Sequence, residues 1–234
     1  MTLRALANTL LSSLFEPTCA ACSQVLLQPL NGAVCERCWA SIGRGTSLNE
    51  HPRGRHAVDW ACAVDLYEGR LRDILHALKY ERRRSIAKPL GGLMRESGTA
   101  MLATADLAVP VPLHPRRERA RGFNQADDLA RQLGLPVAPL LRRVRYTVSQ
   151  IELPADERHQ NVRDAFVVAN GPANRLRQGY GAQEAGRHIP AVVVLVDDVS
   201  TTGATLDACA RVLKAAGVKE VRALTAARVV TGRR

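Results

Sequence analysis

The chain has 234 residues, and its 33 Lys and Arg residues against 22 Asp and Glu give it a net charge of +11. This excess favours a polyanionic partner: a nucleic acid, a phosphorylated substrate or an acidic membrane surface. A hydrophobic fraction of 46% excludes a chain that is disordered throughout, and no apolar run reaches the ~18 residues of a membrane-spanning helix. Aromatic residues make up only 4%, few for a protein that stacks many single-stranded bases.

Residues 1–15 predict a short amphipathic helix, because their leucines recur at helical spacing, at positions 3, 6, 10, 11 and 14. The segment weakly imitates a signal peptide. However, Glu16-Pro17 is a poor cleavage context, so we expect a cytoplasmic protein.

Two Cys-x-x-Cys pairs follow, separated by twelve residues: Cys19 with Cys22, and Cys35 with Cys38. At this separation the two pairs can converge on one tetrahedral Zn²⁺. Four thiolate ligands leave no open coordination position, so the expected zinc is structural. A pair of disulfides or a chance arrangement are the alternatives, and the lack of a secretory signal disfavours disulfides.

Residues 41–60 are polar and contain several Gly and Pro, which predicts a loop or linker. A short strand is expected over residues 63–67, a helix over 71–80 and a second helix over 86–101. We therefore expect an N-terminal helix and zinc module with its linker over residues 1–60, and a second domain over 61–234.

The apolar segment 107–113 contains Pro110 and Pro112, so a strand must end near Val109 and continue as a stiff extended loop. Four arginines follow, at positions 116, 117, 119 and 121. Parallel α/β sheets bind ligands just beyond the carboxyl ends of their strands, and the planar guanidinium group suits phosphate oxygens. The segment therefore predicts contacts with an anionic ligand.

The next part of the chain has weaker patterns. A helix is expected over residues 126–133, followed by a turn at Gly134-Leu135-Pro136 that leads into a strand. Residues 170–189 have little pattern and predict a surface insertion. The last strand is expected over 221–227.

The strongest local pattern covers residues 192–217. Five apolar residues, 192–196, form the kind of run found in parallel strands that are buried on both faces. Asp197 and Asp198 follow, then a turn of small and hydroxyl-bearing residues, and from Leu206 a helical period that ends near Gly217. Such a turn lets backbone N–H groups approach a phosphate, and the helix N-terminus adds partial positive charge. The alternative is an ordinary strand–helix unit in which Thr202 caps the helix and the carboxylates are solvated.

The sequence VDDVSTTGAT in this stretch resembles the phosphoribosyl pyrophosphate (PRPP) binding motif of type I phosphoribosyltransferases. The resemblance implies that the carboxylates address the ribose hydroxyls, with Mg²⁺ accompanying PRPP, and that the turn cradles the 5-phosphate. The PRPP-binding residues that it implies are Asp197, Asp198, Ser200, Thr201, Thr202, Gly203, Ala204 and Thr205. Purine-salvage relatives have an acidic residue two positions before the motif glycine, where this chain has Thr201, so a purine acceptor is less well supported.

Three features together resemble the ComF (competence protein F, GntX-like) family: the segment VPVPLHPRRERARGFNQA, the sequence LKY at 78–80 and the cysteine pairs. The resemblance implies an α/β fold, with a type I phosphoribosyltransferase-like parallel sheet flanked by helices and a small N-terminal zinc-ribbon module. It also implies that Lys79, Arg116, Arg117 and Arg121 lie on the pyrophosphate side of the site.

The segment 142–168 resembles the same family, and the corresponding region of the type I fold is a mobile hood over the substrate. The hood residues that the resemblance implies are Arg145, Gln150, Arg158 and Asn161. The alternative is an ordinary charged helix flanked by loops.

Two functions remain open at this point. The first is a PRPP-binding phosphoribosyltransferase, or a protein of that fold that binds PRPP without transferring it. The second is a basic, zinc-containing nucleic-acid-binding accessory protein. The ComF resemblance implies a role in DNA uptake or in the use of external DNA, with single-stranded DNA and a DNA-uptake helicase as partners at the inner face of the membrane.

Because adjacent carboxylates repel each other, replacing Asp197 and Asp198 together by Asn is expected to leave the ligand-free protein as stable as wild type or slightly more so.

Overall fold

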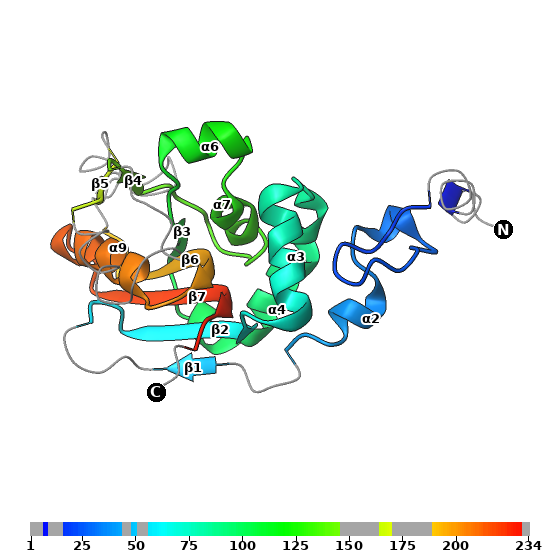
Figure 1. Cartoon of the computed structure of the whole chain (residues 1–234). Coiled ribbons are helices and arrows are strands. Elements are labelled where there is room, and N and C mark those ends of the chain that lie inside the picture. Colours follow the sequence, from blue (N-terminus) through cyan, green and yellow to red (C-terminus); the bar gives the residue numbers. More distant parts are fainter. Residues whose placement is uncertain are drawn as a thin grey trace.

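The computed structural model describes residues 7–8, 16–43, 48–50, 56–145, 164–169 and 189–230. Its centre is a five-stranded sheet with the strand order β1-β2-β7-β6-β3 (Figure 1). The strands are β1 (Leu48–Glu50), β2 (Trp60–Leu66), β3 (Leu107–Pro110), β6 (Val192–Ser200) and β7 (Glu220–Arg228). Neighbouring strands run parallel except β1, which pairs antiparallel with β2. This confirms the predicted α/β fold.

The strand β6 is buried on both faces, as its apolar run predicts. Val193 and Leu195 belong to the hydrophobic cluster that includes α9 (Ala204–Ala215), while Val194 and Val196 belong to the cluster on the opposite face. The second cluster contains side chains from α3 (Gly69–Tyr80), α4 (Ala87–Ser97), α5 (Thr99–Leu102) and α7 (Gln125–Ala130). Helices pack on both faces (Figure 1), and in sheets of this kind ligands bind just beyond the carboxyl ends of the strands.

The strand β6 is longer than the apolar run alone predicts, because β7 offers backbone partners along its whole length. Asp197 pairs with Thr225 and Ser200 with Arg228, so the ladder continues through both carboxylates. The helix α9 then begins at Ala204, and Gly217, with a φ of +106°, follows its C-terminus as predicted.

Two helices differ from the sequence prediction for local reasons. The helix expected over residues 86–101 is divided at Gly98, where a Cβ atom would lie 2.9 Å from a methyl carbon of Leu224 in β7. The extended loop predicted after Val109 is short, because the arginine segment behind it, for which no secondary structure was predicted, forms the helix α6 (Pro115–Arg121). His114 caps this helix by accepting a hydrogen bond from the Arg116 N–H at 3.2 Å, and Gly122 ends it with a φ of 86°.

The remaining elements are short. The strands β4 (Leu141–Arg143) and β5 (Phe166–Val168) form a separate antiparallel pair, and η2 (Arg84–Ile86) precedes α4. Instead of the strand predicted after residue 136, Val137 makes a single parallel bridge to Ala108. The strand β1 falls within the range 41–60 that was expected to be a loop. The predicted insertion, apart from Ile189, and most of the predicted N-terminal helix lie outside the described residues.

The cysteine-containing module projects from one side of the sheet domain (Figure 1) and includes η1 (Pro29–Asn31) and α2 (Glu36–Trp39). The Arg70 guanidinium of α3 donates a hydrogen bond to the Ala21 carbonyl at 2.6 Å, and the Gly43 N–H donates to Asp65 at 3.0 Å. The domain ranges 1–60 and 61–234 stay a prediction. Within the described part of the chain, no helix combines the length and apolar character needed to cross a membrane.

Candidate functional site

Two carboxylates at the carboxyl end of β6 form the floor of the site. Asp198 is only 7% exposed, and its carboxylate lies 2.9 Å from the Lys79 ammonium group in the last turn of α3. Burial alone would lower the pKa of Lys79, but the charge and hydrogen bond of Asp198 and the charge of Asp197 outweigh it, so the net shift is upward. Lys79 therefore stays protonated beside the two carboxylates. Its ion pair with Asp198 joins α3 to β6, two elements that are far apart in the chain.

Asp197 has a different environment from its neighbour. Burial raises its pKa from the ordinary 3.8 to about 7, and the adjacent Asp198 charge adds to the rise. The Asp198 N–H donates a hydrogen bond to the Asp197 carboxylate at 2.9 Å, and Lys79 and Arg143 act in the opposite direction, but they offset only part of the effect. Asp197 is thus a carboxylate that a hydroxyl donor or a cation would stabilise.

The turn after β6 leads directly into α9. Gly203 adopts a left-handed φ of 76° at the N-cap position, and none of the described side chains caps the helix there. The Thr202 hydroxyl oxygen is buried and has no hydrogen-bond partner among the described residues. The alternative in which Thr202 merely caps the helix is therefore wrong, and so is a pair of fully solvated carboxylates.

A cavity of about 520 Å³ opens beyond these strand ends. Arginines line its other side: Arg117 and Arg121 are four residues apart and so share one face of α6. The cavity is lined by Lys79, Tyr80, Arg82, Val111, Pro112, Leu113, Arg117, Ala120, Arg121, Gln125, Arg143, Asp197, Asp198, Val199, Thr201 and Thr205. The fold therefore places two carboxylates and several guanidinium groups around one space.

The structure brings together some of the sequence-predicted site residues and separates others. Lys79, Arg117, Arg121, Asp197, Asp198, Thr201 and Thr205 line the large cavity. Ser200, Thr202 and Gly203 line a smaller cavity of about 280 Å³, which Thr201 also borders. Ala204 is buried, and Arg116 is exposed on α6 and lines neither cavity. The roles assigned to these residues stay predictions.

Arg143 is a cavity residue that the sequence did not reveal. It is 7% exposed, and its guanidinium carbon lies 5.2 Å from the centroid of the Phe166 ring. Burial lowers its pKa, and the charge of Arg117 lowers it further. Two guanidinium groups on one cavity wall repel each other, and an anion between them would relieve that repulsion. Its position in the sequence Arg142-Arg143-Val144-Arg145 gives no local signal that one arginine is buried.

The predicted hood is described only in part. Arg145 follows β4 and is exposed, whereas Gln150, Arg158 and Asn161 lie outside the described residues. The strands β4 and β5 stand on either side of that range, and Arg143 at the end of β4 borders the cavity. The hood assignment stays a prediction.

The four predicted metal ligands converge. The sulfur atoms of Cys19, Cys22, Cys35 and Cys38 all lie within 4.8 Å of one another, and those of Cys22 and Cys35 are 3.8 Å apart. Tetrahedral Zn–S bonds of about 2.3 Å place ligand sulfurs about 3.8 Å apart, so the arrangement fits such an ion. All four are free thiols, which rules out the alternative pair of disulfides in this structure.

The electrostatics of the cluster also suit a cation. Burial raises the pKa of Cys19, but N–H groups of Cys35, Ala21 and Cys22 hydrogen-bond its sulfur and bring the net value down to about 6. Burial and the neighbouring sulfurs raise the pKa of Cys38. Four such thiols cannot all ionise side by side unless a cation neutralises them, so the cluster could hold a metal such as zinc.

With this geometry in place, comparison with known proteins gives consistent results. Residues 119–234 match the phosphoribosyl transferase domain family. The chain is 34% identical to Competence protein F of Haemophilus influenzae over 145 residues, which cover 59% of this chain and 58% of that protein. It is 31% identical to DNA utilization protein YhgH of Salmonella typhi over 219 residues, 87% of each chain.

Solved structures give a weaker similarity. One described as the allosteric regulatory enzyme of purine biosynthesis is 21% identical, with a TM-score of 0.32, and the match covers 60% of this chain and 26% of that one. The sequence relatives decide the assignment: this chain belongs to the family of Competence protein F and the DNA utilization protein YhgH, with a phosphoribosyltransferase domain and an N-terminal four-cysteine cluster.

Proposed function

We propose that this chain binds PRPP in the 520 Å³ cavity. The observation that carries the proposal is that one cavity pairs two adjacent carboxylates, Asp197 and Asp198, with the guanidinium groups of Arg117, Arg121 and Arg143. A ligand that satisfies both must offer hydrogen-bond donors and strong anions. PRPP does so, since its ribose carries hydroxyls and its remaining groups are a phosphate and a diphosphate. Inorganic phosphate alone would bring no ribose hydroxyls to the carboxylates.

The assignment of groups follows from the chemistry of each wall. The carboxylates would accept hydrogen bonds from the ribose hydroxyls, and Thr201 and Thr205, the residues of the turn that line the same cavity, would donate hydrogen bonds to the 5-phosphate. The arginines would hold the diphosphate. Mg²⁺ bound with the ligand would neutralise part of the diphosphate charge and could be held by the carboxylates.

The same arrangement would support pentosyl transfer. When the bond from the ribosyl carbon to the diphosphate lengthens, negative charge grows on the departing diphosphate oxygens. Guanidinium groups already fixed around that position would stabilise this charge, which is an electrostatic contribution to catalysis. Thr201 stands where purine-salvage relatives have an acidic residue, so we do not propose a purine acceptor.

The experiment that tests PRPP binding is a thermal melt with Mg²⁺ and PRPP, with Mg²⁺ and ribose 5-phosphate, and with Mg²⁺ and inorganic diphosphate. A ligand at a hundredfold excess over its dissociation constant stabilises the protein by about 2.7 kcal/mol. We expect PRPP to reach this shift at lower concentration than ribose 5-phosphate or diphosphate, because only PRPP contacts both the carboxylates and the arginines of the cavity with all of its groups. Equal responses to PRPP and diphosphate would contradict the proposal.

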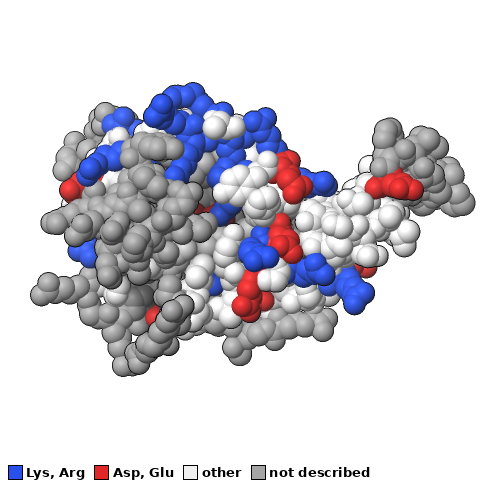
Figure 2. All heavy atoms as spheres, in the orientation of Figure 1, with Lys and Arg blue, Asp and Glu red and all other residues white. Residues whose placement is uncertain are grey.

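We propose a second role on the outer side of the same helix. Figure 2 shows Lys and Arg side chains gathered over the part of the surface where Figure 1 places α6. Arg116 and Arg119 are exposed on α6 and do not line the cavity, whereas Arg117 does. Together with the names of the relatives, this favours contact with single-stranded DNA during its uptake or use, beside a helicase at the inner face of the membrane. The low aromatic content favours contacts with phosphates over base stacking.

Salt dependence tests the DNA role. Binding of a fluorescent single-stranded oligonucleotide, followed by anisotropy, should weaken with salt, with a log–log slope of about −0.7 per phosphate contact. Arg116→Ala with Arg119→Ala should reduce that slope by roughly one to two contacts and leave the PRPP shift unchanged. Binding that does not change with salt would contradict this role.

We propose further that the metal of the four-cysteine cluster is Zn²⁺ and that it holds structure. Its four ligands would all be protein thiolates, so no position remains for a substrate. The cluster also shares one hydrophobic core with α3, through buried residues that include Cys19, Ala21 and Cys38. The ion would therefore stabilise the junction between the module and the sheet domain.

A further inference from the structure

Gln125, the first residue of α7, has an unusual position for a polar side chain. It is 2% exposed, and it borders the large cavity. Its side-chain nitrogen is buried and has no hydrogen-bond acceptor among the described residues. A buried amide donor without a partner is costly, so such groups are rare in native proteins unless a ligand or water satisfies them.

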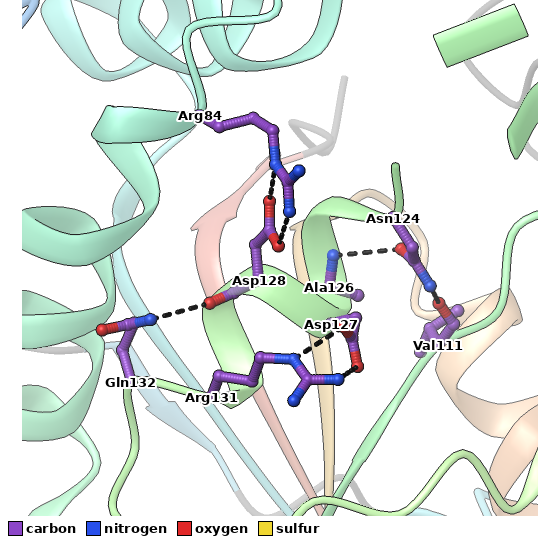
Figure 3. A network of polar contacts seen from close by, with 8 residues as sticks. All are labelled: Arg84, Val111, Asn124, Ala126, Asp127, Asp128, Arg131 and Gln132. Atoms are coloured by element: carbon purple, nitrogen blue, oxygen red, sulfur yellow. Dashed lines mark hydrogen bonds and ion pairs between the residues drawn. The ribbon is translucent and has the colours of Figure 1, made fainter. Parts of the chain in front are cut away.

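The surroundings hold this side chain in place. Asn124, the preceding residue, donates a hydrogen bond from its side chain to the Val111 carbonyl at 3.1 Å and accepts one from the Ala126 N–H at 3.1 Å (Figure 3). Further along the helix, Asp128 accepts two hydrogen bonds from Arg84, at 2.8 and 2.6 Å. The start of α7 is therefore tied to the end of β3 and to η2, and these contacts fix the backbone from which the buried Gln125 side chain extends.

The cavity that Gln125 borders is rich in cationic side chains, which cannot accept a hydrogen bond from its amide. The wall is formed by the segment that carries Arg117 and Arg121, and by Arg143 on β4, and guanidinium groups only donate hydrogen bonds. The hydrogen bonds of Asn124 bring Gln125 next to Val111, at the start of the arginine-bearing segment. An oxygen of a bound ligand would supply the acceptor that the described residues do not, and the cations that line the same cavity favour an anionic ligand. The amide can rotate to present its NH₂ group, and an anion favours that orientation.

We propose that Gln125 is a ligand-binding residue of this site and that its side-chain amide donates a hydrogen bond to a diphosphate oxygen of PRPP. The inference rests on the proposed function and adds to it a neutral donor among the cations. Its role would be to help position the diphosphate end of the ligand, since a hydrogen bond from a buried amide depends on the place and direction of its acceptor.

The test compares Gln125→Met with Gln132→Met. Methionine keeps the length of glutamine and removes the amide. Gln132 follows α7, donates its own hydrogen bond to the Asp128 carbonyl at 3.3 Å and does not line the cavity, so it is a matched control (Figure 3). Ligand-free melting temperatures and dissociation constants for PRPP and ribose 5-phosphate, each with Mg²⁺, are measured for both variants and wild type.

We expect Gln125→Met to melt at the wild-type temperature or above it, because an unsatisfied buried donor is gone. Its affinity for PRPP should fall about tenfold, equivalent to about 1.4 kcal/mol, and its affinity for ribose 5-phosphate should not change. Gln132→Met should bind both ligands as wild type does. If Gln125→Met does not fold, Gln125→Glu keeps the shape and should weaken PRPP binding more strongly, because its carboxylate repels the diphosphate.

Three results would overturn the inference. If a Gln125 variant has a lower melting temperature and wild-type affinity for PRPP, then Gln125 stabilises the fold and does not bind the ligand. Equal losses for PRPP and ribose 5-phosphate would place the amide at the other end of the ligand. A wild-type protein without any PRPP response would overturn the proposed function and this inference together, whereas a wild-type response with unchanged variants overturns the inference alone.

Discussion

The two carboxylates at the end of β6 should respond in opposite ways to the same substitution. Asp198 is paired with the buried Lys79 at 2.9 Å, and its removal leaves that ammonium group without its closest counter-charge. Breaking a buried pair in this way costs roughly 3–5 kcal/mol. We therefore expect Asp198→Asn to destabilise the ligand-free protein. The sequence alone suggests that both carboxylates can be replaced without loss, and the Lys79 contact changes that expectation for Asp198.

Asp197→Asn should instead stabilise the protein, and the gain should grow with pH. The folded-state pKa of Asp197 is about 7 against an ordinary 3.8, so its contribution to stability is fully present below pH 4 and is lost as the pH rises through 7. This difference in pKa corresponds to at most roughly 4 kcal/mol. Because Asp197 is only partly buried by its exposed area, we expect about 2 kcal/mol at pH 8.5, or roughly 4–8 °C in melting temperature.

The assay is urea denaturation and thermal melting of wild type, Asp197→Asn and Asp198→Asn at pH 5, 7 and 8.5 without ligand. The Asn side chain at 197 still accepts the hydrogen bond from the 198 N–H, so the comparison isolates charge. A gain for Asp197→Asn that is the same at pH 5 and 8.5 would refute the reasoning, as would equal losses for the two variants. With Mg²⁺ and PRPP present, both should lose most of the ligand-induced shift.

Two further predictions concern the metal and the arginines. Purified protein should hold one Zn²⁺ per chain, and metal analysis that finds no zinc in wild-type protein kept under reducing, chelator-free conditions would contradict this. Cys35→Ser should lose the zinc and lower the stability of the N-terminal module, while far-ultraviolet circular dichroism should still show a folded α/β domain. Arg117→Ala should weaken PRPP binding by about tenfold or more, whereas Arg119→Ala, on the exposed side of the same helix, should not weaken it. Calorimetric titrations measure both affinities, and equal losses of PRPP affinity in the two variants would mean that only general charge matters.

The choice of control residues itself depends on the structure. Arg82 begins the basic run Arg82-Arg83-Arg84 and is exposed. In the fold it lines the cavity and donates a hydrogen bond to the Ala120 carbonyl of α6 at 3.0 Å. Arg119 is therefore the better control, because it shares the helix with Arg117 and stays outside the cavity.

Local patterns were sufficient for the parts of this protein whose information lies within one short segment. The run at 192–196 determined a buried strand, because only a strand covered on both faces has no polar side. The spacing of the four cysteines determined a cluster, because two tight knuckles can meet at one tetrahedral ion. The acidic pair and the hydroxyl-rich turn were likewise found from the sequence, because strand, turn and helix are consecutive there.

Tertiary structure decided everything that depends on contacts between distant segments. It brought Lys79 to Asp198, made one of three closely spaced arginines, Arg143, a buried cavity residue, and left the Gln125 amide nitrogen beside the cavity without a partner among the residues that the structure describes. None of these has a local signature, since burial and hydrogen bonding depend on what packs against a residue rather than on its neighbours in the chain. The sequence determined which chemical groups this protein has, and packing determined which of them meet and with what pKa.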